Sequence, residues 1–195
     1  QSQLKALVLC DDIVGRSGSV ALGNALSRWD PSNKLECLFL TDNAIDDSGL
    51  QALVEGMMNC RSLENLYLNG NQSITADGLR FLFPLLQSES HSLKMLELSR
   101  IDFGDDGAIA LAEGLRGNKT LNQLWLSPET AGITSVGWSA FSRLLCDTST
   151  IKNTYLSNHT LTKIGDIHNV STPDDIQSYL RANYSLAGKY AAIYK

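Results

Sequence analysis

The sequence lacks any apolar run of the roughly 18 residues that a membrane-spanning helix needs, so insertion into a membrane is not expected. Its first residues also lack the basic region, apolar stretch and cleavage site of a signal peptide, which favours the cytoplasm. Lys and Arg are not clustered and the net charge is −5, which argues against a nucleic-acid-binding surface. An acidic surface of this kind is compatible with a basic protein partner.

Residues that usually form metal, disulfide or phosphate sites are also sparse. The four cysteines include no CxxC pair, so neither a disulfide framework nor a zinc site is expected. The three histidines, His91, His159 and His168, lack metal-ligand spacing, and the sequence has no G-x-x-x-x-G-K-[ST] phosphate loop. We therefore expect no cofactor, no metal and no catalytic residue.

Asn-x-Ser/Thr sequons complicate the cytoplasmic interpretation. Five are present, against the roughly two or three that chance gives in a chain rich in these residues. They keep secretion open as an alternative, although the repeat described below places one of them in a buried corner. The sequons begin at Asn71, Asn118, Asn158, Asn169 and Asn183.

Leucine, in contrast, is abundant and recurs at fixed intervals. The pattern L-x-x-L-x-L occurs four times, with steps of 28, 30 and 28 residues between copies. A further copy fits upstream from Leu4, and a weaker one fits downstream with Ile151, Thr154 and Leu156. The four clear copies begin at Leu35, Leu63, Leu93 and Leu121.

Each copy carries further matching positions after the leucines. Alternating leucines predict a short strand, and apolar residues at helical spacing, such as Leu50, Leu53 and Val54, predict a helix after it. An asparagine five places after the middle leucine, as at Asn43 and Asn71, can bind backbone groups in the corner between them. One such unit cannot bury its own apolar face, but stacked units can.

These repeats of 28–31 residues resemble the ribonuclease-inhibitor type of leucine-rich repeat, which also occurs in Ran GTPase-activating proteins and nucleotide-binding immune receptors. The resemblance implies an α/β solenoid shaped like a horseshoe, with a parallel β-sheet on the concave face and helices on the convex face. From the fourth copy on, Ile101, Glu129 and His159 replace the asparagine, and an insertion near residues 128–132 predicts a larger loop.

The two ends of the repeat array differ. We assign residues 1–160 to leucine-rich repeats, five full and one partial, and residues 161–195 to a C-terminal helical cap. Thr172-Pro173-Asp174-Asp175 predicts a helix start, and a second helical stretch is expected over residues 186–194. Together with this helix start, residues 157–161 resemble the closing module of leucine-rich-repeat proteins of algae and other protists. The first repeat has no polar cap before it, so we expect further repeats or a partner subunit to cover it.

Acidic residues and loop arginines could indicate chemistry, and both also have a structural interpretation. Asp47, Asp77 and Asp106 lie shortly before a repeat glycine, where a helix N-cap is expected. Ran GTPase-activating proteins present an arginine from a loop at the end of a strand, and Arg16 and Arg100 occupy such loops here. The resemblance therefore leaves open an enzyme-regulating role through these arginines.

The clearest functional signal is the residue between the last two leucines of each copy, which points out of the concave sheet. Four of the six residues in this column are aromatic, and exposed aromatic side chains are common anchors of protein interfaces. The structural alternative is that aromatic residues favour strands for packing reasons alone. The candidate binding residues are Phe39, Tyr67, Glu97, Trp125 and Tyr155 in this column, with Asn69, Lys94 and Gln123 beside it.

From these features we predict a non-catalytic protein–protein interaction module, or scaffold, that binds a protein partner on its concave sheet. Two alternatives remain. One is a GTPase-activating or other enzyme-regulatory protein, and the other is an architectural subunit of a larger complex, held by its uncapped N-terminal end.

Overall fold

The computed structural model describes residues 4–12, 14–30, 34–127, 131–166 and 172–185. Within them, six parallel strands form one sheet, and their order in the sheet follows their order in the chain. The sheet is not closed, because β1 and β6 are its two edges. The strands are β1 (Ala6–Val8), β2 (Cys37–Phe39), β3 (Asn65–Tyr67), β4 (Met95–Glu97), β5 (Gln123–Trp125) and β6 (Lys163–Gly165).

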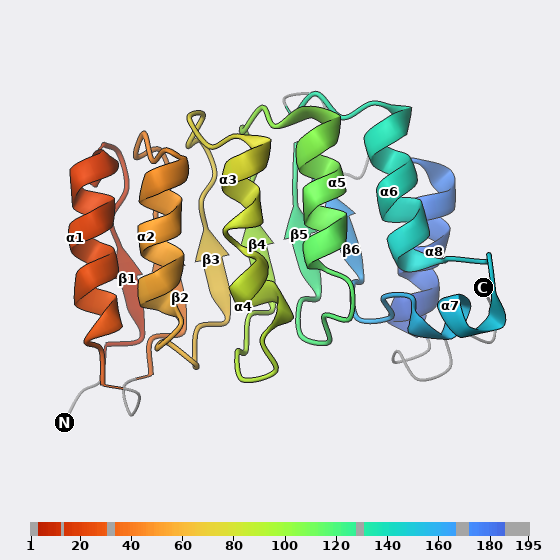
Figure 1. Cartoon of the computed structure of the whole chain (residues 1–195), viewed down its shortest axis with the longest axis horizontal. Helices are drawn as coiled ribbons and strands as arrows, with labels where there is room; N and C mark the ends of the chain where they lie inside the picture. The colour runs from red at the N-terminus through yellow and green to blue at the C-terminus, as the bar shows by residue number, and fades with distance from the viewer. Residues whose placement is uncertain (1–3, 13, 31–33, 128–130, 167–171, 186–195) are drawn as a thin grey trace.

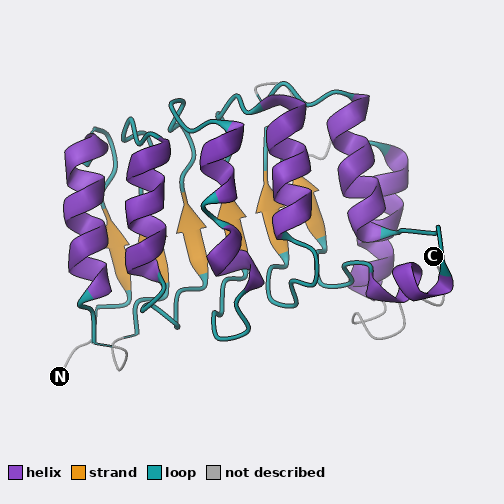
Figure 2. Ribbon diagram, in the orientation of Figure 1, coloured by secondary structure: helices purple, strands orange, loops and turns teal. Residues whose placement is uncertain are grey.

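Helices line up along one face of this sheet, while the other face is left open (Figures 1 and 2). Each strand is followed along the chain by one or two helices, which is the arrangement of an α/β solenoid. The helices are α1 (Gly15–Ser27), α2 (Asp47–Met57), α3 (Ala76–Arg80), α4 (Phe83–Gln87), α5 (Gly104–Gly114), α6 (Ser135–Leu145), α7 (Ile151–Leu156) and α8 (Asp174–Ser185).

The middle leucine of each repeat lies in a core between the sheet and the helices. Leu38, Leu66, Leu96 and Leu124 pair in register from β2 to β5, and all four are fully buried. The apolar positions therefore stack into one continuous core, which confirms the predicted solenoid of parallel strand–helix units. Leu7 of β1 is only partly buried, since within the described residues β1 has a neighbouring strand on one side alone.

Glycines allow α1 and α2 to pack closely against each other. A Cβ atom at Gly23 would clash with the backbone carbonyl of Ala52, and a Cβ atom at Gly56 would clash with the backbone of Gly23. Any larger residue at these positions would therefore push the two helices apart.

The sixth strand does not lie where the leucine pattern predicts it. We expected a weak strand copy at Ile151, Thr154 and Leu156, but these residues form α7, and Ile151 is 92% exposed. The sixth strand is β6, in which Ile164 pairs with Leu124 of β5 and is fully buried. This part of the prediction is therefore wrong.

A local capping signal explains the error. The Thr150 hydroxyl accepts a hydrogen bond from the backbone N–H of Asn153 at 3.0 Å, which starts a helix where the leucine pattern predicts a strand. As a result, the central residues of β5 and β6 are 40 residues apart, and β6 lies inside the stretch 161–195 that we assigned to a helical cap. Further on, α8 begins at Asp174, as predicted, and packs against α6. The expected helix over residues 186–194 lies outside the described residues.

Acidic residues before the repeat glycines do not cap the helices as predicted. The predicted N-caps Asp47, Asp77 and Asp106 lie inside α2, α3 and α5, so the prediction is wrong. Instead, Asp46 caps α2 and Thr75 caps α3. Asp47 accepts hydrogen bonds from the backbone N–H and the hydroxyl of Thr75, at 2.8 and 2.7 Å. The acidic side chain thus joins its repeat to the start of the next helix.

A buried asparagine joins neighbouring repeats in the corner that follows the strands. The Asn71 side-chain oxygen accepts hydrogen bonds from the backbone N–H groups of Asn43 and Ile45, each at 3.0 Å. Its amide nitrogen donates to the carbonyl oxygens of Leu40 and Leu68, at 2.8 and 2.7 Å. This is the corner role that the sequence pattern predicts.

The sequons are structural in the described part of the chain. Four of the five lie there, and the asparagine of each is buried. Asn118, for example, accepts a hydrogen bond from the backbone N–H of Leu121 and donates one to the carbonyl of Leu86. A glycan has no space at such a position in the folded chain, so these sequons do not support secretion. The four are Asn71, Asn118, Asn158 and Asn183.

Candidate protein-binding surface

The open face of the sheet displays the predicted column of side chains. We call it the central column; in register from β1 to β6 it consists of Val8, Phe39, Tyr67, Glu97, Trp125 and Gly165. Val8 is 62% exposed, and the next four members are partly exposed. Tyr155, which we predicted as the sixth member, lies in α7 instead, because α7 occupies the segment that we assigned to the sixth strand.

Aromatic members of the central column contact their neighbours along the sheet. Phe39 and Tyr67 lie on adjacent strands and stack, with ring centroids 4.1 Å apart and 9° between the ring planes. The indole Nε1–H of Trp125 donates a hydrogen bond to Gln123 at 3.0 Å. The Lys163 ammonium lies 3.8 Å from the centroid of the Trp125 ring, which is a cation–π contact. The indole face is therefore accessible to a cation on this side of the molecule.

Two other predicted binding residues already have partners within the chain. The Lys94 ammonium forms an ion pair with Glu64 at 2.6 Å. Asn69 accepts a hydrogen bond from the Thr41 hydroxyl at 2.8 Å. Both contacts join neighbouring repeats on the open face, and an exposed ion pair such as Lys94–Glu64 contributes little to stability.

A hollow of about 440 Å³ lies in the middle of the open face, between Tyr67 on β3 and Trp125 on β5. Glu97 and Met95, on the strand between them, also line it. The structure thus brings together three predicted binding residues, Tyr67, Glu97 and Trp125. The sequence analysis missed Asp166, which also lines the hollow, because this residue follows the misplaced sixth strand.

The polar groups of the hollow include a phenol and a carboxylate. Burial raises the pKa of the Tyr67 hydroxyl above its ordinary value, and the charges of Cys37 and Glu97 raise it further, so the phenol is neutral at physiological pH. One oxygen of Glu97 accepts a hydrogen bond from the backbone N–H of Ser99 at 3.2 Å. In the described part of the chain, no Lys or Arg forms an ion pair with Glu97.

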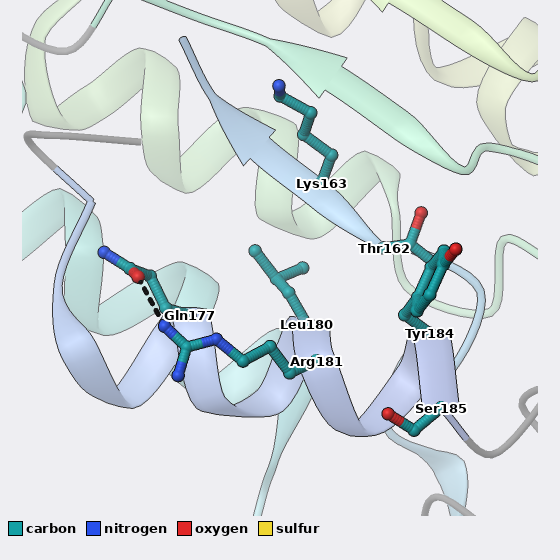
Figure 3. A pocket seen from close by; sticks show the side chains of 7 residues that line it. All are labelled: Thr162, Lys163, Gln177, Leu180, Arg181, Tyr184 and Ser185. Atoms are coloured by element: carbon teal, nitrogen blue, oxygen red, sulfur yellow. Dashed lines mark hydrogen bonds between the residues drawn. The ribbon is translucent and has the colours of Figure 1, made fainter. Parts of the chain in front are cut away.

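A second cleft, of about 310 Å³, lies between β6 and α8 (Figure 3). Lys163 and Arg181 contribute positive charge to its lining, and Arg181 donates a hydrogen bond to Gln177 at 2.9 Å. Figure 3 shows the Lys163 side chain extending away from Arg181, and it contacts Trp125. Because the two charged groups point apart, we assign no ligand to this cleft.

The arginines that suggested a regulatory role are both held by acidic residues of other repeats. Arg16 lies in α1 rather than in a loop, and its Nε is 3.3 Å from a carboxylate oxygen of Asp46. Arg100 lies in the loop after β4, as predicted, and its guanidinium is 2.7 Å from the carboxylate of Asp42. These contacts join separate repeats, so both guanidinium groups are ion-paired within the chain.

Among the residues that the structure describes, no group of three or more His, Cys, Asp or Glu side chains could hold a metal ion. All four cysteines are free, and burial raises the pKa of the Cys60 thiol to about 11, which makes it a poor nucleophile. Within the same residues, we find no helix that is both long and apolar enough to cross a membrane.

Comparison with known proteins points to the same class as the fold. The family described as Leucine Rich repeat matches residues 32–54, 59–83 and 89–112. Protein phosphatase 1 regulatory subunit 37 homolog of Caenorhabditis elegans is 31% identical over 102 residues, which cover 52% of this chain and 11% of that protein. NACHT, LRR and PYD domains-containing protein 3 of Homo sapiens is 33% identical over 131 residues, which cover 67% of this chain and 12% of that protein.

The parallel sheet, the stacked helices and the matched repeats define an α/β leucine-rich-repeat solenoid. The chain is a leucine-rich-repeat protein. It spans only 11–12% of the length of these relatives, and the similarities do not distinguish the ribonuclease-inhibitor type from other types. The repeats and the relatives indicate a protein–protein interaction module.

Proposed function

We propose that this protein binds a protein partner on the open face of its sheet, without catalysing a reaction, and that Tyr67 and Trp125 anchor the contact. The observation that carries the proposal is the hollow between these two rings, in the middle of a face that none of the described helices covers. Aromatic side chains in such pockets are frequent hot spots of protein interfaces. The partner would approach from the side opposite the helices.

Packing between neighbouring strands explains only some of the aromatic residues in the central column. Phe39 and Tyr67 stack on each other, so their contact stabilises the sheet without any partner. Trp125 differs, because its register neighbours in the column are Glu97 on β4 and Gly165 on β6. Ring stacking between strands therefore does not explain a large aromatic residue at position 125. The cation–π contact with Lys163 uses one side of this ring, and a binding role accounts for the part that lines the hollow.

The names of the relatives suit a binding role but do not choose a partner. The worm relative is named as a regulatory subunit of protein phosphatase 1, and the human relative is named for its NACHT, LRR and PYD domains. These names differ in kind, so we propose a protein partner and leave its class to experiment. We also propose that the repeats are of the ribonuclease-inhibitor type.

The test is affinity purification from the native source, followed by a direct binding measurement with each recovered protein. Tyr67→Ala and Trp125→Ala each remove one anchor and should each weaken binding by about 2 kcal/mol. Val136→Ala is the matched control, because Val136 is 56% exposed but lies on α6, on the helical side of the sheet. Circular dichroism checks that all three variants fold. A partner bound equally well by both anchor variants would show that the open face is not the binding site.

We also propose a cytoplasmic location. Four free cysteines and four buried sequons both suit a reducing compartment in which asparagines are not glycosylated. Cell fractionation of the native source with an antibody against the chain tests this, and recovery of a glycosylated, secreted form would contradict it.

A further inference from the structure

The central column contains a slot, which is the part of the hollow between the rings of Tyr67 and Trp125. Phe39 and Tyr67, on adjacent strands, stack at 4.1 Å between ring centroids. Tyr67 and Trp125 instead lie in register two strands apart, with Glu97 between them. Two strand spacings separate the backbones of these residues by about 9.6 Å, which is about twice the shortest distance of roughly 4.5 Å at which two planar groups stack. The spacing of the strands therefore leaves room for one planar group between the two rings.

The slot also carries a carboxylate that no Lys or Arg of the described residues pairs. On the same face, Glu36 pairs with Lys5 at 2.9 Å and Glu64 pairs with Lys94 at 2.6 Å. Glu97 accepts a hydrogen bond from a backbone N–H, but no described Lys or Arg forms an ion pair with it. Since the chain carries a net charge of −5, a cationic group from outside would be attracted to this position.

Trp125, whose ring forms one side of the slot, already contacts a cation within the chain. The Lys163 ammonium lies 3.8 Å from the centroid of the Trp125 ring. Lys163 lines the separate cleft beside α8 (Figure 3) and is not among the residues that line the hollow. Trp125 thus provides a ring that contacts a cation, next to the Glu97 carboxylate, with which no described Lys or Arg forms an ion pair.

We propose that the slot binds an arginine side chain of the protein partner. The planar guanidinium stacks between the rings of Tyr67 and Trp125 and forms an ion pair with the Glu97 carboxylate. Arginine fits better than lysine, because its charged group is flat and can stack on aromatic rings while it donates hydrogen bonds to a carboxylate. This inference rests on the proposed function, since it specifies the chemistry that the open face recognises.

The test uses N-acetyl-arginine N-methylamide as the probe, titrated into the ¹⁵N-labelled chain. The indole N–H signal of Trp125, assigned with Trp125→Phe, reports binding at the slot itself. We expect a saturable shift of this signal in the millimolar range. The matching citrulline compound, which has nearly the same shape but no charge, should bind at least about tenfold more weakly.

Two variants separate the slot from the general acidity of the surface. Glu97→Gln keeps the size of the side chain and should weaken arginine binding about tenfold. Glu64→Gln removes the same charge from a neighbouring carboxylate that Lys94 already pairs, and should leave binding unchanged. Circular dichroism checks that both variants fold.

The inference is overturned if arginine and citrulline bind equally, or if Glu97→Gln binds arginine as well as the unmodified chain does. An absence of any shift at the Trp125 indole would also overturn it. The proposed function would survive each of these results if Tyr67→Ala and Trp125→Ala still weaken binding of the purified partner. The two proposals can therefore fail separately.

Discussion

Asn71→Ala tests whether the corner asparagine holds neighbouring repeats together. The substitution removes all four hydrogen bonds of a fully buried side chain: two accepted from the backbone N–H groups of Asn43 and Ile45, and two donated to the carbonyls of Leu40 and Leu68. A net contribution of about 1 kcal/mol per hydrogen bond gives a loss of about 4 kcal/mol in the free energy of unfolding. The methyl group of alanine cannot replace any of these contacts.

Urea unfolding followed by far-ultraviolet circular dichroism measures this loss. For a domain of this size, 1 kcal/mol corresponds to about 2–4 °C in Tm, so the Tm of the Asn71→Ala variant should fall by roughly 8–16 °C. Asn59→Ala is the control, because the Asn59 side chain makes a single exposed hydrogen bond to the carbonyl of Ser27. If both variants lost the same small amount of stability, the corner asparagine would not join the repeats in the way that we describe.

Two further predictions concern packing and pH. Gly23→Ala should lower the free energy of unfolding by about 1–3 kcal/mol, because the new methyl group would clash with the backbone of Ala52; an unchanged Tm would contradict this. Burial lowers the pKa of His91 below its ordinary value of 6.5. A hydrogen bond to the backbone of Met58 acts in the opposite direction, and the charge of Arg61 lowers the pKa further. Below pH 6.5 the unfolded chain therefore binds more protons than the folded chain. The contribution of His91 to the free energy of unfolding is complete above pH 6.5 and is lost as the pH falls. In urea unfolding at several pH values, His91→Gln should show a weaker pH dependence.

The fold could be predicted where the same local physics recurs in every repeat. Leu38, Leu66, Leu96 and Leu124 are spaced so evenly that one strand–helix unit predicts the next, and the structure confirms this order. The prediction is wrong at the sixth strand because Thr150 caps an inserted helix, and the period of the leucines does not reveal such an insertion.

The candidate site could be predicted only in part. Strand alternation decides which side chains point to the open face, so Tyr67, Glu97 and Trp125 could be identified from the sequence. The hollow could not be predicted, because its lining depends on the register of three strands and on Asp166, which lies beyond the inserted helix. Nor could the sequence show that Lys94 pairs with Glu64 while no described cation pairs with Glu97, since ion pairs between strands depend on rotamers.

Glu97→Phe separates the stability of the sheet from the proposed binding role. Residue 97 stands in register between Tyr67 and Trp125, so a phenylalanine there could stack on both rings and fill the slot. Each aromatic pair contributes about 0.5–1.5 kcal/mol, so the free energy of unfolding should rise by about 1–3 kcal/mol. Binding of the arginine probe and of the partner should be lost at the same time, because the new ring fills the slot and the Glu97 carboxylate is gone. Such a gain in stability at the expense of binding is common at functional positions. A variant that is less stable than the unmodified chain, or that still binds the probe, would contradict the inference that Glu97 exists at this position to receive a cation.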